Sequence, residues 1–227
     1  MTVLALLHTS PVHVPVFDAL RDQDAPGLEL RHLVDEQLLA RARELGPDVV
    51  SEAVGSVLAE AVAEGADAVL CTCSTIGAVA EAASASLGVP VLRVDRPMAA
   101  AAVARGRRIA VVAAVASTLE PTAALIREEA GDRPLALRMV PAEHAWPYFE
   151  AGDTEAYLAE IARTVDALTD VDVVVLAQAS MAPAAERTTL KVPVLASPRP
   201  GLRAAAAAVE AAVAGAAAAS AGRTRTG

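Results

Sequence analysis

The chain repeats itself along its length. The segment DAVLCTCSTIGAVAE at residues 67–81 aligns in step with DVVVLAQASMAPAAE at residues 172–186. Further along, VPVLRVDRP at 89–97 matches VPVLASPRP at 192–200. Because the repeat spans about half of the chain, it indicates a duplicated domain and not a solenoid of short units. Two like halves would place related residues on opposite walls of one cleft, so we expect the active site between them.

Short Val, Leu and Ala runs alternate with longer amphipathic stretches, which predicts an α/β fold with two pseudo-symmetric parallel-sheet halves of about four strands each. The predicted strands are Val3–Leu7, Leu28–Leu33, Ala68–Thr72, Pro90–Val94, Ile109–Ala113, Leu135–Val140, Val173–Ala177 and Pro193–Ala196. The predicted helices are Val14–Asp22, Glu36–Leu45, Pro47–Glu64, Thr75–Leu87, Met98–Arg105, Pro121–Ala130, Thr154–Leu168, Ala182–Thr189 and Leu202–Ala219.

The sequence predicts four segments in order. The first half comprises residues 1–105 and the second half residues 106–200. Residues 201–219 form a C-terminal helix that packs back on the first half, and residues 220–227 form a disordered tail.

Composition narrows the class of protein. Of the 227 residues 54% are hydrophobic but only 2% aromatic, so the core must be built from Ala, Val and Leu. The net charge of −9 argues against nucleic acid or an anionic membrane as partners.

The start of the chain lacks the basic residues of a signal peptide. The two cysteines are separated by one residue and cannot bridge long loops, so we expect a reducing, cytoplasmic location. A homo-oligomer is compatible with the sequence.

Small polar residues follow several predicted strands. In open α/β sheets, ligands bind beyond the carboxyl ends of the strands, and helix N-termini there attract anions. The hydroxyls of the serine and threonine residues that follow the strands would bind a small-molecule carboxylate substrate. The alternative is that they are ordinary helix N-caps. The residues are Ser10, Ser74, Thr75, Ser117, Thr118 and Ser180.

Cys73 is the strongest candidate for chemistry. It lies between a predicted buried strand and a helix start, where a thiolate is favoured and can act as an acid/base or as a nucleophile. The alternative is a buried structural cysteine, which is the role that we expect for Cys71. A metal site is not expected, because His8 is the only further ligand nearby. No cofactor is expected either, since the sequence has no nucleotide-binding glycine motif, and its single lysine, Lys191, lies in a turn.

These residues resemble the aspartate/glutamate (Asp/Glu/hydantoin) racemase superfamily. Cys73-Ser74-Thr75 resembles the Cys-Asn-Thr motif of the family's first half, and Leu176–Ser180 stands where its second-half Cys-Thr-His motif belongs. The stretches His8–Ser10 and His32–Glu36 are similar to a subgroup of the family. The resemblance implies a cofactor-independent isomerase that acts on an amino-acid-like or diacid-like carboxylate, with one cysteine on each face of the reacting carbon.

The chain departs from this pattern at the second cysteine, where it has Gln178, a residue without a useful pKa. We therefore expect a single-cysteine member, with Gln178 donating its amide to a carboxylate or oxyanion. In one version Cys73 pairs with His8 or Glu36 as second base, and His8 is the better candidate. In others, Cys73 adds to a cis-alkene diacid, or protonates one face after decarboxylation, as in a lyase of the arylmalonate decarboxylase type. A further alternative is a non-catalytic protein that binds a small carboxylate.

Overall fold

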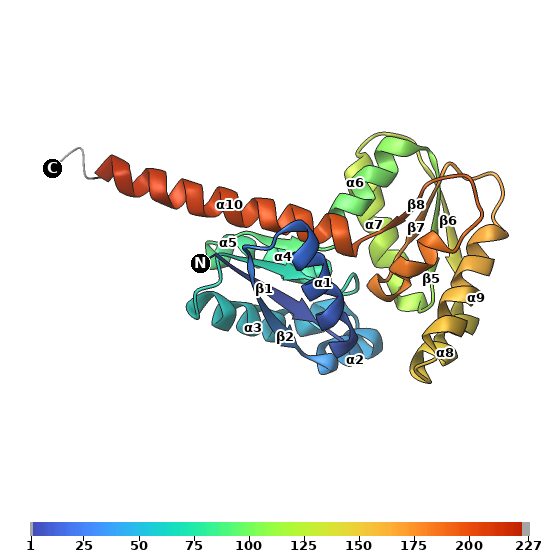
Figure 1. The fold of residues 1–227 in the computed structure, drawn as a ribbon, viewed down its shortest axis with the longest axis horizontal. Helices are drawn as coiled ribbons and strands as arrows, with labels where there is room; N and C mark the ends of the chain where they lie inside the picture. The colour runs from blue at the N-terminus through green and yellow to red at the C-terminus, as the bar shows by residue number, and fades with distance from the viewer. Residues whose placement is uncertain (1, 224–227) are drawn as a thin grey trace. The chain divides into compact units, whose positions relative to one another are not determined.

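The computed structural model describes residues 2–223, with side-chain surroundings for residues 2–215. It divides into two compact units (Figure 1). Unit 1 comprises Met1–Arg93 with Gly201–Gly227, and unit 2 comprises Val94–Pro200. Each unit contains one four-stranded parallel sheet flanked by helices, which confirms the predicted fold class.

Unit 1 has the strand order β2-β1-β3-β4, with every neighbouring pair parallel. Its strands are β1 (Val3–His8), β2 (Glu29–Val34), β3 (Ala68–Cys71) and β4 (Val91–Arg93). Its helices are α1 (Val14–Asp24), α2 (Glu36–Leu45), α3 (Ser51–Ala63), α4 (Gly77–Ala82) and α5 (Ser84–Leu87), with short 3-10 helices η1 (Pro11–His13) and η2 (Pro47–Val50). One sheet face packs against α2, α3 and α4, and its cluster includes Leu7, Leu38 and Leu58.

Unit 2 repeats this topology with the order β6-β5-β7-β8. Its strands are β5 (Arg108–Ala113), β6 (Ala136–Pro141), β7 (Val173–Leu176) and β8 (Val194–Ala196). Its helices are α6 (Arg96–Arg105), α7 (Leu119–Ala130), α8 (Trp146–Glu150) and α9 (Thr154–Asp166), with 3-10 helices η3 (Ala116–Thr118), η4 (Glu143–Ala145) and η5 (Ala179–Glu186). One face of this sheet packs on α6 and α7, and the other on α9 and η5.

The repeated aspartates have the same task in both units. Asp67 precedes β3, and its Oδ2 accepts a hydrogen bond of 2.8 Å from the N–H of Val3, where β1 begins. Asp172 precedes β7, and its Oδ2 accepts 2.9 Å bonds from the N–H groups of Arg107 and Arg108, where β5 begins. In each unit the carboxylate satisfies an otherwise unpaired donor at the start of the central strand.

Three predicted boundaries need correction. The division between the halves lies at Val94 and not after residue 105, because α6 shares a core cluster with α7 and Arg96 donates a 2.5 Å hydrogen bond to Glu129. The helix predicted at Ala182–Thr189 is instead the 3-10 helix η5, with Pro183 inside it. The break after Ala82 divides the helix predicted at Thr75–Leu87 into α4 and α5.

The last helix, α10 (Pro198–Arg223), is long (Figure 1). From Gly201 onward it belongs to unit 1, and Arg203 Nε lies 3.0 Å from Asp24 Oδ2 at the end of α1. Part of the predicted disordered tail is helical, up to Arg223, and residues 224–227 lie outside the described residues.

Candidate functional site

Cys73 follows the carboxyl end of β3 and is half-buried. It packs against an apolar cluster that includes Leu7, Cys71 and Ile76, on the face of the sheet covered by α3 and α4. Cys71 itself is fully buried, and its thiol donates to the carbonyl oxygen of Cys73 at 3.6 Å. Of the two thiols, only that of Cys73 is partly open to a ligand.

His8 ends β1 and points to the opposite face from Leu7, because successive side chains of a strand alternate. Its Nδ1 lies 2.8 Å from Thr72 Oγ1, and its Nε2 lies 2.8 Å from His32 Nδ1. Burial, reinforced by the nearby His32 and His13, lowers the pKa of His8 to about 3, so the ring is neutral at physiological pH.

The geometry does not support His8 as the proton carrier that the sequence predicted. The residue is fully buried, and both ring nitrogens are already hydrogen-bonded within unit 1. Glu36, the other predicted partner, is an exposed residue in the first turn of α2. Neither side chain forms a hydrogen bond with Cys73 in the part of the chain that the structure describes.

The predicted hydroxyls of unit 1 border Cys73 or follow His8. Ser74 and Thr75 are 7% and 6% exposed, and they precede the short helix α4. Ser10 is half-buried and precedes η1, which it does not cap through its side chain. Ser10 is therefore not the ordinary side-chain N-cap that the alternative interpretation required.

Gln178, the counterpart of Cys73, follows β7 in unit 2 and is half-buried. Its Oε1 accepts two backbone hydrogen bonds, from the N–H of Ala114 at 2.6 Å and from that of Val115 at 3.2 Å. These bonds fix the amide plane and leave Nε2 without a hydrogen-bond partner among the described residues. The side chain can donate to a ligand, but it cannot exchange a proton at ordinary pH.

The other predicted hydroxyls of unit 2 differ in their surroundings. Ser117 Oγ is buried without a hydrogen-bond partner among the described residues, and Thr118 is 6% exposed. Thr118 stands at the N-cap position of α7 but makes no side-chain capping bond. Ser180 Oγ lies 2.9 Å from the hydroxyl of Tyr157, whose pKa burial raises to about 12. Ser180 is therefore already engaged, whereas Ser117 is not.

Two polar contacts near the candidate site residues were not predicted from the sequence. Tyr157 is a fully buried helix residue whose hydroxyl contacts Ser180, and Asp18 of α1 approaches His32 at 3.2 Å. Both depend on which helix face packs against the sheet. The only sequence signal was the presence of a polar group within an otherwise apolar helical stripe.

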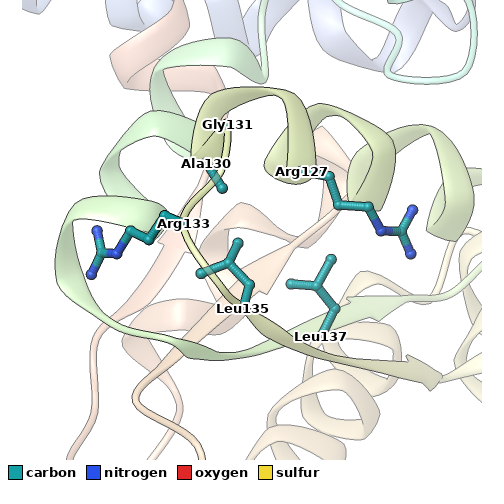
Figure 2. A pocket seen from close by; sticks show the side chains of 6 residues that line it. All are labelled: Arg127, Ala130, Gly131, Arg133, Leu135 and Leu137. Carbon is teal, nitrogen blue, oxygen red and sulfur yellow. The ribbon is translucent and has the colours of Figure 1, made fainter.

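A cavity of about 310 Å³ lies elsewhere in unit 2, next to the C-terminal end of α7 and to β6. Figure 2 shows Arg127 and Arg133 pointing away from one another, with Leu135 and Leu137 between them. Arg127 is paired with Glu120 at 2.7 Å, and Arg133 donates to the carbonyl of Val103. None of the predicted site residues lines this cavity.

Two searches of the described residues bear on other classes of site. No group of three or more His, Cys, Asp or Glu side chains in residues 2–223 is arranged to hold a metal ion. None of the helices in that range is both long enough and apolar enough to cross a membrane.

Comparison with solved structures finds the same fold in several enzymes. Glutamate racemase from Francisella tularensis, solved in complex with D-glutamate, matches with a TM-score of 0.70 and 13% identity, over 89% of this chain and 79% of that one. Allantoin racemase from Klebsiella pneumoniae matches at 0.61 and 20%, over 94% and 88%. Arylmalonate decarboxylase matches at 0.59 and 20%, over 91% and 92%. At these identities the likeness concerns the fold alone.

The sequence itself was also compared with known proteins. No curated protein matches the chain. The family model of Asp/Glu/hydantoin racemases matches residues 13–220, which is most of the chain. The chain belongs to the Asp/Glu/hydantoin racemase family.

Proposed function

We propose that this protein is a cofactor-independent isomerase that acts on a small amino-acid-like or diacid-like carboxylate, with Cys73 as its only reactive thiol. One observation carries the proposal: Cys73 is a half-buried thiol at the carboxyl end of a central strand, and its counterpart Gln178 has no proton to exchange. Family membership supports an isomerase or lyase, and the residues support a single thiol.

Unit 2 indicates where a carboxylate would bind in unit 1. There, an amide oxygen is held by two consecutive backbone N–H groups, those of Ala114 and Val115. The registers of the two sheets make Thr9 and Ser10 the counterparts of these residues. Neither the Thr9 N–H nor the Ser10 N–H forms a hydrogen bond with another described residue. A cysteine offers no oxygen to fill this place, so the two donors are free for a substrate carboxylate oxygen.

The chemistry requires only proton transfer. The Cys73 thiolate removes the proton from the carbon next to the carboxylate, and the electron pair of the C–H bond moves into an enolate that hydrogen-bond donors stabilise. Return of the proton to the same face regenerates the substrate and gives only exchange with solvent, so inversion requires the planar enolate to turn in the site before the thiol delivers the proton to the opposite face. For a cis-alkene diacid, the thiolate instead adds to the double bond, the single bond rotates, and the C–S bond breaks as the alkene reforms.

Gln178 favours a second candidate, a decarboxylase. If a malonate-like acid loses carbon dioxide, the electrons of the broken C–C bond form the enolate, and only one proton must be delivered. A single thiol is sufficient for that step, and water then restores its proton. A base on the second face, which Gln178 cannot supply, is not needed.

The test is proton exchange in heavy water, followed by NMR over a panel of amino acids, hydantoins, arylmalonates and maleate. The variants are Cys73→Ala and its matched control Cys71→Ala, which removes the buried thiol two residues away. We expect deuterium incorporation or conversion with wild type and Cys71→Ala, and at least about a hundredfold loss with Cys73→Ala.

The outcomes separate the candidates. Incorporation or isomerisation without carbon dioxide supports the isomerase, and release of carbon dioxide with one deuterium in the product supports the decarboxylase. Turnover that survives in Cys73→Ala would refute both. If wild type binds a carboxylate, as seen by thermal shift, but turns over none of the panel, the protein is a carboxylate-binding member of the family.

A further inference from the structure

A continuous chain of hydrogen-bonded side chains crosses unit 1. Asp18 Oδ1 of α1 lies 3.2 Å from His32 Nε2, on β2. His32 Nδ1 lies 2.8 Å from His8 Nε2 on β1, and His8 Nδ1 lies 2.8 Å from Thr72 Oγ1 at the end of β3. Thr72 Oγ1 in turn lies 3.1 Å from the carbonyl oxygen of Leu7. Four elements are joined within the same unit.

Counting protons fixes the direction of each bond. Thr72 has one hydroxyl proton, and it is donated to the Leu7 carbonyl, so His8 must donate from Nδ1 and accept at Nε2. His32 then donates from Nδ1 to His8, and it must also donate from Nε2 to the Asp18 carboxylate. With an ionised Asp18, all bonds form together when His32 carries a proton on both nitrogens.

The two ends of this hydrogen-bonded chain of side chains differ in exposure. Asp18 has a side chain 43% exposed and also lies 3.7 Å from Arg21 Nη2. His8 is fully buried against the ring of Phe17, at 5.6 Å between ring centroids. His13, 6.4 Å from His8, is kept neutral by burial, which lowers its pKa to about 4. The Asp18 carboxylate therefore lies at the partly exposed end, and the buried histidines at the other end are neutral.

Unit 2 shows that this fold does not need such a chain. The sheet registers pair His8, His32 and Thr72 with their counterparts in unit 2, because β5 pairs with β6 and β7 as β1 pairs with β2 and β3. The counterparts are Ala113, Met139 and Ala177. All three belong to one apolar cluster. The polar chain occurs only in the unit that carries the thiol.

The hydrogen-bonded chain of side chains ends at Thr72, which immediately precedes Cys73 in the sequence. Both the N–H and the hydroxyl of Thr72 are bonded to the Leu7 carbonyl, at 3.0 and 3.1 Å. His8 holds that hydroxyl from the other side. Because Cys73 packs on the opposite face of the sheet from His8, the chain can affect the thiol only through the backbone that it fixes.

We propose that His8, His32 and Asp18 are positioning residues, which fix Thr72 and thereby the backbone that presents the Cys73 thiol. This inference rests on the proposed function, in which Cys73 is the reacting group. Misplacement of a reacting group by about 1 Å can lower the rate on the order of a hundredfold. A rigid strand end that holds the Cys73 thiol in position would therefore raise the rate.

The main test replaces three residues of the hydrogen-bonded chain with their apolar counterparts from unit 2. This is the triple variant His8→Ala, His32→Met and Thr72→Ala. Since apolar replacement of a buried polar network is often neutral for stability, we expect a folded protein with a melting temperature near that of wild type. We expect kcat to fall at least about tenfold with KM changed less than about threefold, because positioning acts on the chemical step.

Two single variants at matched residues of α1 test the proposal if the triple variant is unstable. Asp18→Asn weakens the charged end of the chain, and Asp22→Asn makes the same change at an exposed residue of the same helix, whose carboxylate contacts only Arg21 in the described chain. We expect kcat to fall about threefold or more for Asp18→Asn and to stay unchanged for Asp22→Asn. Equal kcat values in wild type, the triple variant and Asp18→Asn would overturn the proposal.

Two further readouts need no substrate. In a Cys71→Ala background, the rate of Cys73 alkylation by iodoacetamide should differ at least about threefold between otherwise wild-type protein and the triple variant. Nitrogen-15 NMR of the imidazoles at pH 6 should show a neutral His8 with its single proton at Nδ1. An unchanged alkylation rate, or a His8 protonated at Nε2, would refute the positioning chain even if no carboxylate is ever turned over. Absence of turnover with both results as expected would reject only the proposed function.

Discussion

Gln178 has a structural task that a cysteine could not perform. Its amide oxygen accepts from two backbone donors in the loop after β5, and these N–H groups would otherwise be unpaired. Cys73 occupies the matching position and leaves the matching donors of Thr9 and Ser10 without such a partner. The two residues therefore make the two units chemically different despite their common topology. Under the proposed function, the two unpaired donors of unit 1 bind the substrate carboxylate.

Replacing Gln178 should test this structural task. Gln178→Leu leaves two partly buried N–H groups unpaired, and we expect it to lower the free energy of unfolding by about 1–3 kcal/mol. Gln178→Glu keeps an oxygen acceptor in place and should stay within about 1 kcal/mol of wild type. Urea denaturation measures both. Equal stability of the leucine and glutamate variants would contradict the assigned role of the amide oxygen.

The buried ring of His8 should make unit 1 sensitive to acid. Its pKa falls from 6.5 in the unfolded chain to about 3 in the folded one, so the unfolded state binds more protons between these values. The stability is therefore fully present above about pH 6.5 and is lost as the pH falls towards 3, at up to about 1.4 kcal/mol per pH unit. His13 contributes in the same direction down to about pH 4.

The triple variant of the histidine chain is the control for this pH dependence. Without His8 and His32, the free energy of unfolding should decline less steeply between pH 6.5 and 4 than it does in wild type, as measured by urea denaturation. Carboxylates elsewhere titrate alike in both proteins, so they cancel in the difference. Parallel curves would contradict a neutral, buried His8.

Helix and strand identity followed from the sequence where packing agreed with local preference. Every predicted strand is present. The central strands β1, β3, β5 and β7 are Val-, Leu- and Ala-rich runs that are buried on both faces of a parallel sheet, whereas the edge strands β2 and β6 are only partly buried. The segment after β7 was less predictable, since Pro183 disrupts a regular α-helix and the residues form η5 instead. The assignment of α6 to unit 2 required its contacts with α7, which no local pattern encodes.

Gly106 lies at the end of α6, where a side chain has no room. A Cβ at this position would come within 2.3 Å of Asp172 Cβ, the residue that caps the start of β5. We expect Gly106→Ala to lower the free energy of unfolding by about 1–3 kcal/mol, since neither backbone can move freely. Gly27→Ala, whose Cβ would meet nothing within 4 Å, should be within about 0.5 kcal/mol of wild type. Similar losses in the two variants would argue against the close contact with Asp172.

The internal repeat let the sequence predict much of the fold and select candidate site residues. Repeated motifs predicted two like units and singled out Cys73 against Gln178, because an alignment of halves exposes any residue that breaks the match. The histidine chain was beyond such an alignment. His8, His32 and Thr72 come together only through the registers of β1 with β2 and β3, and Asp18 only through the face that α1 presents. The hydrogen bonds of His8 therefore could not be predicted, and its role as a proton carrier stays a prediction that this geometry does not support.

The measurement that tests the central claim most directly is a titration of activity against modification of Cys73, with a substrate that the heavy-water panel identifies. The protein is alkylated in steps, the adduct at each cysteine is quantified by mass spectrometry, and residual turnover is measured. We predict that activity falls in proportion to a single adduct at Cys73, that substrate slows the loss, and that Cys71 stays unmodified because it is buried. Activity that persists after complete modification of Cys73 would contradict the account.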